Sequence, residues 1–170
     1  MKHYIDKDGN IYGFEDDVVV SGMPGSLVFA SAHGDVLDVP AELSRYSLPA
    51  PTSGQQLASA QAVQIATLNA ACARSIVAGF TSGALGSAYS YPSTLTDQAN
   101  QNSVAQCSSG GLLWCATGGT WSFKSHSQEQ AQGVVASFTT WLNQCQQKLV
   151  TLSGQVSAAT TVSAVQAVVW

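Results

Sequence analysis

The fold of this 170-residue chain is decided by residues 131–156, AQGVVASFTTWLNQCQQKLVTLSGQV. Apolar side chains recur there at alternating intervals of four and three positions, a heptad spacing that places them on one face of a helix. The members of this seam are Ala131, Val135, Phe138, Leu142, Cys145, Leu149, Leu152 and Val156. The flanking positions hold Gln, Thr, Ser and Asn, where coiled coils usually carry Glu and Lys. The pattern predicts a long amphipathic helix with an uncharged rim.

The segment before this helix, GLLWCATGGTWSFKSHS (111–127), has two aromatic-rich runs on either side of Gly118-Gly119. Two such runs around a glycine pair predict a β-hairpin. Ser125 or Ser127 is placed to cap the long helix, with a glutamine three residues further on as in a capping box. We expect the segment to be a packing corner that turns the chain into its longest helix.

Further helices are expected on both sides of this corner. One helix is predicted before Gly79, where it ends. Apolar and amide residues on one face of it step by three or four, at Leu57, Gln61, Ile65, Leu68, Cys72 and Ile76. The polar segment 94–106 predicts a short helix, and Thr161 caps a last one over 162–169. Residues 80–92, FTSGALGSAYSYP, are expected to form an irregular connection.

Residues 1–46 alternate apolar and polar positions between glycine and proline turns, which is typical of β-strands. The expected strands are HYID (3–6), NIYGF (10–14), VVV (18–20), SLVFAS (26–31) and DVLDV (35–39). SLPAPTSG (47–54) has two prolines and no apolar period, so it predicts a linker. We therefore predict an α+β protein. It has a small N-terminal β-meander domain (1–46), the linker (47–54), and a mainly helical C-terminal domain (55–170) with a short aromatic β-hairpin before the long amphipathic helix.

Charge excludes several classes of function. Charged residues make up 9% of the chain, against roughly 25% in an average soluble protein. With six Lys and Arg and a net charge of −4, the chain lacks the basic stripe of a nucleic-acid binder. No apolar run approaches the roughly 18 residues of a membrane helix. The opening MKHYIDKDGN has no hydrophobic signal segment, so we expect a cytosolic chain with reduced cysteines.

Neither metal nor cofactor is expected. Cys72, Cys107, Cys115 and Cys145 include no C-x-x-C pair, whereas structural zinc sites need closely spaced ligands. Cys72 and Cys145 fall on the apolar faces of predicted helices, where cysteine packs as a small hydrophobe. The acidic residues of 6–17 loosely resemble a calcium loop, but position six is Ile11 and the terminal acid is Asp17. A hairpin turn is the favoured interpretation.

We predict that the chain is not an enzyme and has no catalytic residues. Cys115 and His126 lie eleven positions apart across the hairpin, and they are the one candidate nucleophile–base pair. His126 stands between two serines, where a capping or surface role is expected. No G-x-S-x-G, phosphate-binding loop or dinucleotide fingerprint occurs, and the acids beyond Glu42 are Asp97 and Glu129.

The aromatic residues of the C-terminal half allow two interpretations. Trp114, Trp121, Phe123, Trp141 and Trp170 suit a sugar-binding platform, or they anchor the hairpin onto the long helix. Packing is favoured, since such rings bury a large area.

Three pieces of the C-terminal region carry a resemblance: SAYSYPSTLTDQANQNS (87–103), LLWCATGGTWSFKSHSQEQAQGV (112–134) and VSAATTVSAVQAVVW (156–170). Together they resemble a domain of unassigned role in tailed-phage and prophage tail proteins. The opening MKHYIDKDGNIYGFEDD (1–17) is similar to the start of phage tail-fibre assembly proteins. The resemblance implies a phage tail component, either a tail-fibre chaperone or a small protein bound to the fibre tip, and it implies no catalytic residue.

We therefore expect a tail-fibre assembly chaperone or fibre-associated structural protein that binds the fibre, or a receptor-binding protein, through its helical domain. The alternatives are a permanent tail-tip or decoration subunit of the virion and a glycan-binding receptor module. The seam is expected to pack partly on the 57–76 helix and partly on a trimeric fibre or on further copies of the chain. The expected location is the host cytoplasm during assembly, with the virion tail as the alternative. The expected partner-binding residues are Trp121, Phe138, Trp141, Leu142, Leu149 and Leu152.

Overall fold

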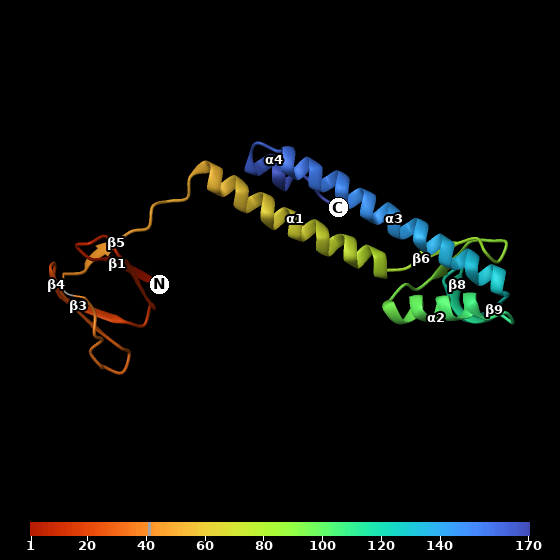
Figure 1. The fold of residues 1–170 in the computed structure, drawn as a ribbon, viewed down its shortest axis with the longest axis horizontal. Helices are drawn as coiled ribbons and strands as arrows, with labels where there is room; N and C mark the ends of the chain where they lie inside the picture. Colours follow the sequence, from red (N-terminus) through yellow and green to blue (C-terminus); the bar gives the residue numbers. More distant parts are fainter. Residues whose placement is uncertain (41) are drawn as a thin grey trace. The chain divides into compact units, whose positions relative to one another are not determined.

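The computed structural model describes residues 1–40 and 42–170, and the chain divides into two compact units, Met1–Pro51 and Thr52–Trp170. The division falls inside the proline-containing segment 47–54. Each unit has its own hydrophobic core, as an independent domain requires. The N-terminal unit consists of strands, and the C-terminal unit of helices and strands (Figure 1). The α+β class predicted from the sequence is thus confirmed, including the long C-terminal helix.

The described part of the N-terminal unit has two small antiparallel sheets. Its strands are β1 (Lys2–Ile5), β2 (Ile11–Phe14), β3 (Val19–Met23), β4 (Ser26–Ala30) and β5 (Ser44–Tyr46). β1 pairs with both β2 and β5, while β3 and β4 form a hairpin. Tyr4, Phe29 and Leu43 are buried between them, with the rings of Tyr4 and Phe29 edge to face at 4.7 Å. This aromatic contact holds the small unit together.

One predicted N-terminal strand is wrong. Residues 35–39 do not form a strand, and only an isolated bridge joins Val36 to Ala30. The structure instead has β5, which pairs with β1 and was not predicted. Alternation in sequence shows that a segment is able to form a strand, but a partner distant in the chain decides which segment does.

The C-terminal unit combines four helices with one four-stranded antiparallel sheet. The helices are α1 (Ser53–Val77), α2 (Leu95–Gln106), α3 (Gln128–Ala158) and α4 (Val162–Gln166). The strands β6 (Phe80–Ser82), β7 (Tyr89–Tyr91), β8 (Gly111–Thr117) and β9 (Thr120–His126) lie in sequence order. The expectation of an irregular connection over 80–92 is wrong, because β6 and β7 extend the predicted hairpin. None of the described helices combines the length and apolar character that crossing a bilayer requires.

Capping boxes fix the start of each longer helix. In each box the cap hydroxyl accepts a hydrogen bond from the N–H three residues on, and that residue's side chain accepts one from the cap N–H. Of the two serines considered as the cap of the long helix, Ser127 fills the role. The three boxes are Thr52 with Gln55, Thr94 with Asp97, and Ser127 with Gln130.

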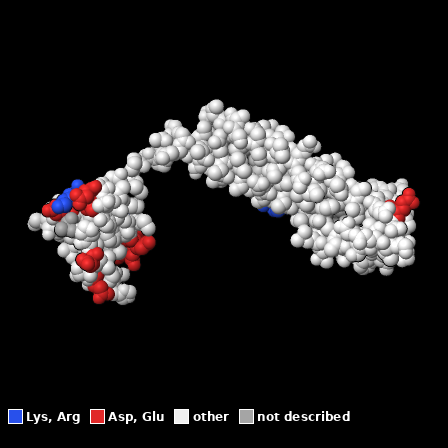
Figure 2. All heavy atoms as spheres, in the orientation of Figure 1, with Lys and Arg blue, Asp and Glu red and all other residues white. Residues whose placement is uncertain are grey.

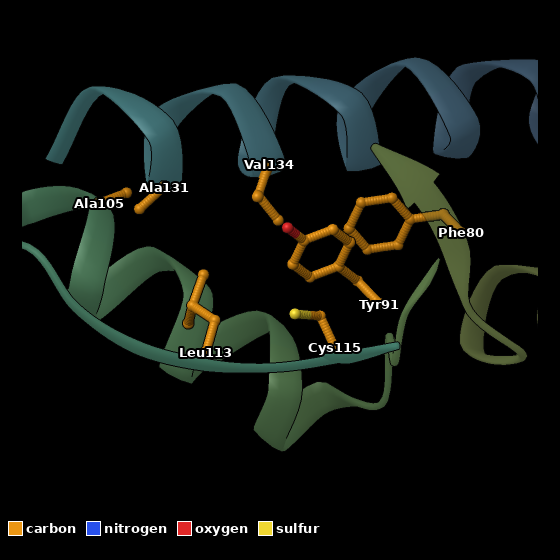
Figure 3. Packing of buried hydrophobic residues seen from close by; sticks show 7 residues of the cluster. All are labelled: Phe80, Tyr91, Ala105, Leu113, Cys115, Ala131 and Val134. Carbon is orange, nitrogen blue, oxygen red and sulfur yellow. The ribbon is translucent and has the colours of Figure 1, made fainter. Parts of the chain in front are cut away.

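α3 belongs to two separate cores, one for each half of its length. Near its start, Ala131 and Val134 pack against Phe80, Tyr91 and Leu113 (Figure 3). The core near its end consists of Leu68 from α1, Val156 from α3 and Val165 from α4, with Leu149 and Leu152 packed against it. All eight members of the predicted seam are buried or partly buried. The seam prediction is therefore confirmed, and its packing on the 57–76 helix is confirmed for the second half of α3.

Polar side chains join α1 to α3. The Gln61 amide donates to the Val156 carbonyl at 3.2 Å, and the Trp141 indole N–H donates to the Ser75 carbonyl at 3.2 Å. Residues 52–170 are all described, and no ion pair occurs among them. Apolar burial and neutral hydrogen bonds, which salt does not screen, therefore stabilise this helix pair.

Replacing Leu68 by Ala should lower the free energy of unfolding of the C-terminal unit by about 2–5 kcal/mol, because it leaves a cavity among α1, α3 and α4. Urea denaturation followed by far-UV circular dichroism measures this loss. Val63→Ala, at a 64% exposed position of the same helix, should change stability by less than about 0.5 kcal/mol. Equal losses for the two variants would contradict the described burial of α1.

Candidate binding site on the aromatic sheet

β8 and β9 pair around Gly118-Gly119, as predicted, and strand alternation gives the sheet two different faces. Leu113 and Cys115 of β8 point inward and are buried. The alternate residues Trp114 and Ala116 belong to the opposite face, where Trp114 pairs with Phe123 and the buried Ala116 with Trp121. We call Leu112, Trp114, Trp121 and Phe123 the outer aromatic face.

The rings of the outer aromatic face touch one another and remain open to solvent. Trp114 and Trp121 are nearly parallel, at 17°, with centroids 6.3 Å apart, and the Phe123 ring is 4.8 Å from Trp114. Trp114 is 42% exposed, Trp121 44% and Phe123 62%. The expectation that these three rings anchor the hairpin onto the long helix is wrong, because α3 packs on the opposite face of the sheet. Trp141 and Trp170 do pack within the unit.

A hollow of about 400 Å³ adjoins the outer aromatic face. Trp114 and Phe123 line one side, and α2 supplies Asp97 and Asn100 on the other. The Asp97 carboxylate uses one oxygen, Oδ2, to cap α2, and its second oxygen has no hydrogen bond to any residue that the structure describes. The exposed Asn100 amide makes no hydrogen bond within the described residues. The hollow therefore presents uncommitted donors and acceptors beside open rings.

A second hollow, of about 340 Å³, lies beside Trp121. Thr81 of β6 and Ser90 of β7 contribute hydroxyl groups to it, and both positions are exposed. Thr81 pairs with Ser90, and Ser90 pairs with Ala116, so both lie on the same side of the sheet as the rings. The outer aromatic face is therefore flanked on two sides by polar, uncharged groups and one carboxylate.

The inner face of the sheet contains a buried polar group, His126. Its Nδ1 is 2.9 Å from the Lys124 carbonyl, and its Nε2 is 2.9 Å from the Tyr91 hydroxyl. A carbonyl only accepts, so Nδ1 donates to it, and in the Nδ1–H tautomer Nε2 accepts from the Tyr91 hydroxyl. The expected capping or surface role of His126 is wrong, because its place on β9 turns it inward, where it is 1% exposed.

Cys115, the sulfur partner considered for His126, is fully buried on the same inner face. Burial raises the pKa of its thiol, and the hydrogen bond with Tyr91 only partly opposes this effect. The thiol is therefore neutral near pH 7 and lacks the thiolate character of an activated nucleophile. The hydrogen-bond partner of His126 Nε2 is the Tyr91 hydroxyl and not the Cys115 thiol.

The acidic N-terminal segment forms a turn, in agreement with the favoured interpretation. One Asp6 oxygen accepts the N–H groups of Asp8 and Asn10, both at 2.9 Å. Hydrogen bonds, first from the Asn10 side chain, lower the pKa of Asp6 to about 2. In the described residues, 1–40 and 42–170, no group of three His, Cys, Asp or Glu side chains is placed to hold a metal ion.

The structure separates the six residues expected to bind a partner. Trp121 lies on the outer aromatic face, while the other five lie on α3. Phe138 and Trp141 pack against the core beneath the sheet, and Leu149 and Leu152 pack against the core with α1 and α4. Leu142 is partly buried between these two regions of α3.

Residues 59–169 match the model of a family described as a domain of unknown function, DUF4376. The match covers more than half of the chain, so the protein belongs to this family. It extends from the first turns of α1 to the end of the C-terminal unit and leaves the N-terminal unit outside. No curated protein and no solved structure matches the chain.

Sequence reasoning identified the aromatic residues of this site and missed its polar part. Asp97 and Asn100 were placed correctly on a short helix, but nothing in their spacing relates them to Trp114. One feature of the sequence bears on the exposure of the rings. Leu113 and Cys115 alternate with Leu112 and Trp114, so the two pairs lie on opposite faces of the strand. Alternation defines two faces but does not tell which face is covered.

Thiol reactivity tests the described burial of the cysteines. All four are unpaired, and Cys107 alone among them is exposed. Hydrogen bonds from Ser109 lower the pKa of Cys107, which increases its thiolate fraction at neutral pH. DTNB should modify one thiol rapidly in the folded protein and all four in denaturant. Ser109→Ala should slow the rapid reaction at pH 7, and rapid modification of Cys115 would contradict the structure.

Replacing Tyr91 by Phe should lower the free energy of unfolding by about 1–3 kcal/mol, because the buried His126 Nε2 loses its hydrogen-bond donor. Chemical denaturation measures the change. Tyr89→Phe is the matched control, because the Tyr89 hydroxyl makes no hydrogen bond within the described residues. A loss in the control as large as that in Tyr91→Phe would count against the His126 assignment.

Proposed function

We propose that the chain is a non-enzymatic phage tail protein, either a tail-fibre assembly chaperone or a fibre-associated structural protein. In this proposal it binds the tail fibre through its helical C-terminal unit. The resemblance of residues 87–103, 112–134 and 156–170 to phage tail proteins supports the phage assignment. The proposal includes no reaction and no cofactor.

The charge distribution of the chain supports a protein partner for the C-terminal unit. Eleven of the sixteen charged residues lie in the first 51 positions, and residues 52–170 hold the other five. Figure 2 shows the C-terminal unit as almost free of charged side chains on the face in view. Interface cores are depleted in charge because buried ions lose their hydration. A long, nearly uncharged unit is thus suited to extensive contact with another polypeptide.

The observation that carries the proposal is a second stripe on α1, made of small and apolar side chains on the side facing away from α3. Its members are all exposed, and they recur at intervals of four and three like the seam of α3. We call it the outer stripe, and it consists of Ser59, Val63, Ala66, Ala70, Ala73 and Val77. Small side chains allow the backbones of two helices to approach closely. We therefore propose the outer stripe as the fibre contact, since most seam residues of α3 already pack within the chain.

Co-expression with the tail-fibre protein of the same genome tests this function. Fibre should be soluble and trimeric with this chain, and it should aggregate without it. The double variant Ala66→Arg with Ala70→Arg should reduce co-purified fibre by about tenfold or more, because it inserts two charges into the contact. Gln147→Arg, at an exposed position of α3, is the matched control and should bind normally. Fibre that is equally soluble and trimeric without this chain would refute the chaperone role.

The second candidate function is a permanent subunit of the virion tail. Mass spectrometry of purified particles distinguishes it from a transient chaperone. A subunit should be present in stoichiometric amounts, whereas a chaperone should be absent or substoichiometric.

A further inference from the structure

We propose that the outer aromatic face binds an uncharged oligosaccharide, whose rings stack on Trp114 and Trp121 and whose hydroxyls bond to Asp97 and Asn100. This site is independent of the outer stripe on α1. It concerns a different surface and a different class of ligand from the fibre contact.

The first argument is the exposure of the rings. Leu112, Trp114, Trp121 and Phe123 form one contiguous patch, and each is more than 40% exposed. The same sheet buries Phe80 and Tyr91 on its other face. Single exposed apolar residues are common, but a contiguous aromatic patch rimmed by polar groups marks a binding site.

The second argument is the polar lining next to the rings. Asn100 offers an amide donor and an amide acceptor with no partner in the described residues, and Asp97 has one unbonded carboxylate oxygen. On the far side of the rings, Thr81 and Ser90 line the second hollow with Trp121. Both sides of the patch therefore have groups that bond to hydroxyls.

A carbohydrate fits this combination better than the other ligands that stack on aromatic rings. A sugar ring has an apolar C–H face for the indoles and hydroxyls at its rim for the amide and carboxylate. A nucleic-acid base also stacks, but its phosphates require cations. Lys124 is the basic residue of β9, and it pairs with Leu113 on the side of the sheet opposite the rings. Asp97 disfavours an anionic sugar, which leaves a neutral one.

Titration of the full chain with neutral oligosaccharides tests the proposal. The probes are cello-, malto-, laminari- and chito-oligosaccharides at millimolar concentration, detected by tryptophan fluorescence and by saturation-transfer NMR. At least one series should bind. Trp114→Ala and Trp121→Ala should each raise its Kd by about tenfold, since each removes a stacking ring.

Two further variants make the test independent of folding defects. Asn100→Ala changes an exposed side chain that has no hydrogen bond to the described part of the chain, so it should keep the fold and still raise Kd severalfold. Val150→Ala, 72% exposed on α3, should leave Kd unchanged. The proposal is overturned if no series binds, or if Asn100→Ala and Trp114→Ala leave Kd unchanged. Loss of fibre binding in the tryptophan variants, with no sugar bound, would assign the outer aromatic face to the fibre instead.

Discussion

The C-terminal unit depends on one constraint, which is that the apolar seam of a 31-residue helix must be buried along its whole length. No single neighbour in the unit covers it. α1 and α4 cover the second half, with Val156 fully buried between them, and the sheet and α2 cover the first half, with Ala131 and Val134 fully buried. Because α3 runs through both cores, it links the helix pair to the sheet and fixes their relative position. A cavity beneath either half is therefore expected to weaken the whole unit.

Neutral amides and hydroxyls serve this unit where many proteins use ions. The capping boxes of α1 and α3 consist of neutral side chains, whereas that of α2 uses the Asp97 carboxylate, and Gln61 and Trp141 bond across the helix pair. Such bonds cost little desolvation compared with buried ion pairs. They also leave a surface that repels other molecules weakly. The low charge of the unit is thus compatible with its stability and with the contacts proposed for it.

The strand pleat separates two kinds of chemistry on the sheet. On the inner face, Cys115, Tyr91 and His126 are buried in a closed hydrogen-bonded group, which is structural in character. On the outer face, Trp114, Trp121 and Phe123 remain exposed, and Trp114 and Phe123 share a hollow with Asp97 and Asn100. Residues 111–127 therefore form both a packing corner and a candidate ligand surface. Alternate residues of the strands belong to one or to the other.

The sequence by itself determined the features that depend on neighbours within about one helical turn or across a tight turn. These are the long seam of α3, the cap at Ser127 and the β8–β9 hairpin, because periodicity, capping and turn chemistry are local. Only the tertiary structure decided which weak strands form, since β5 needs β1 and the pair β6–β7 needs β8. Only the tertiary structure placed Asn100 beside Trp114 and turned His126 inward. The physical reason is that burial and strand pairing depend on contacts between residues distant in the chain, which no local pattern specifies.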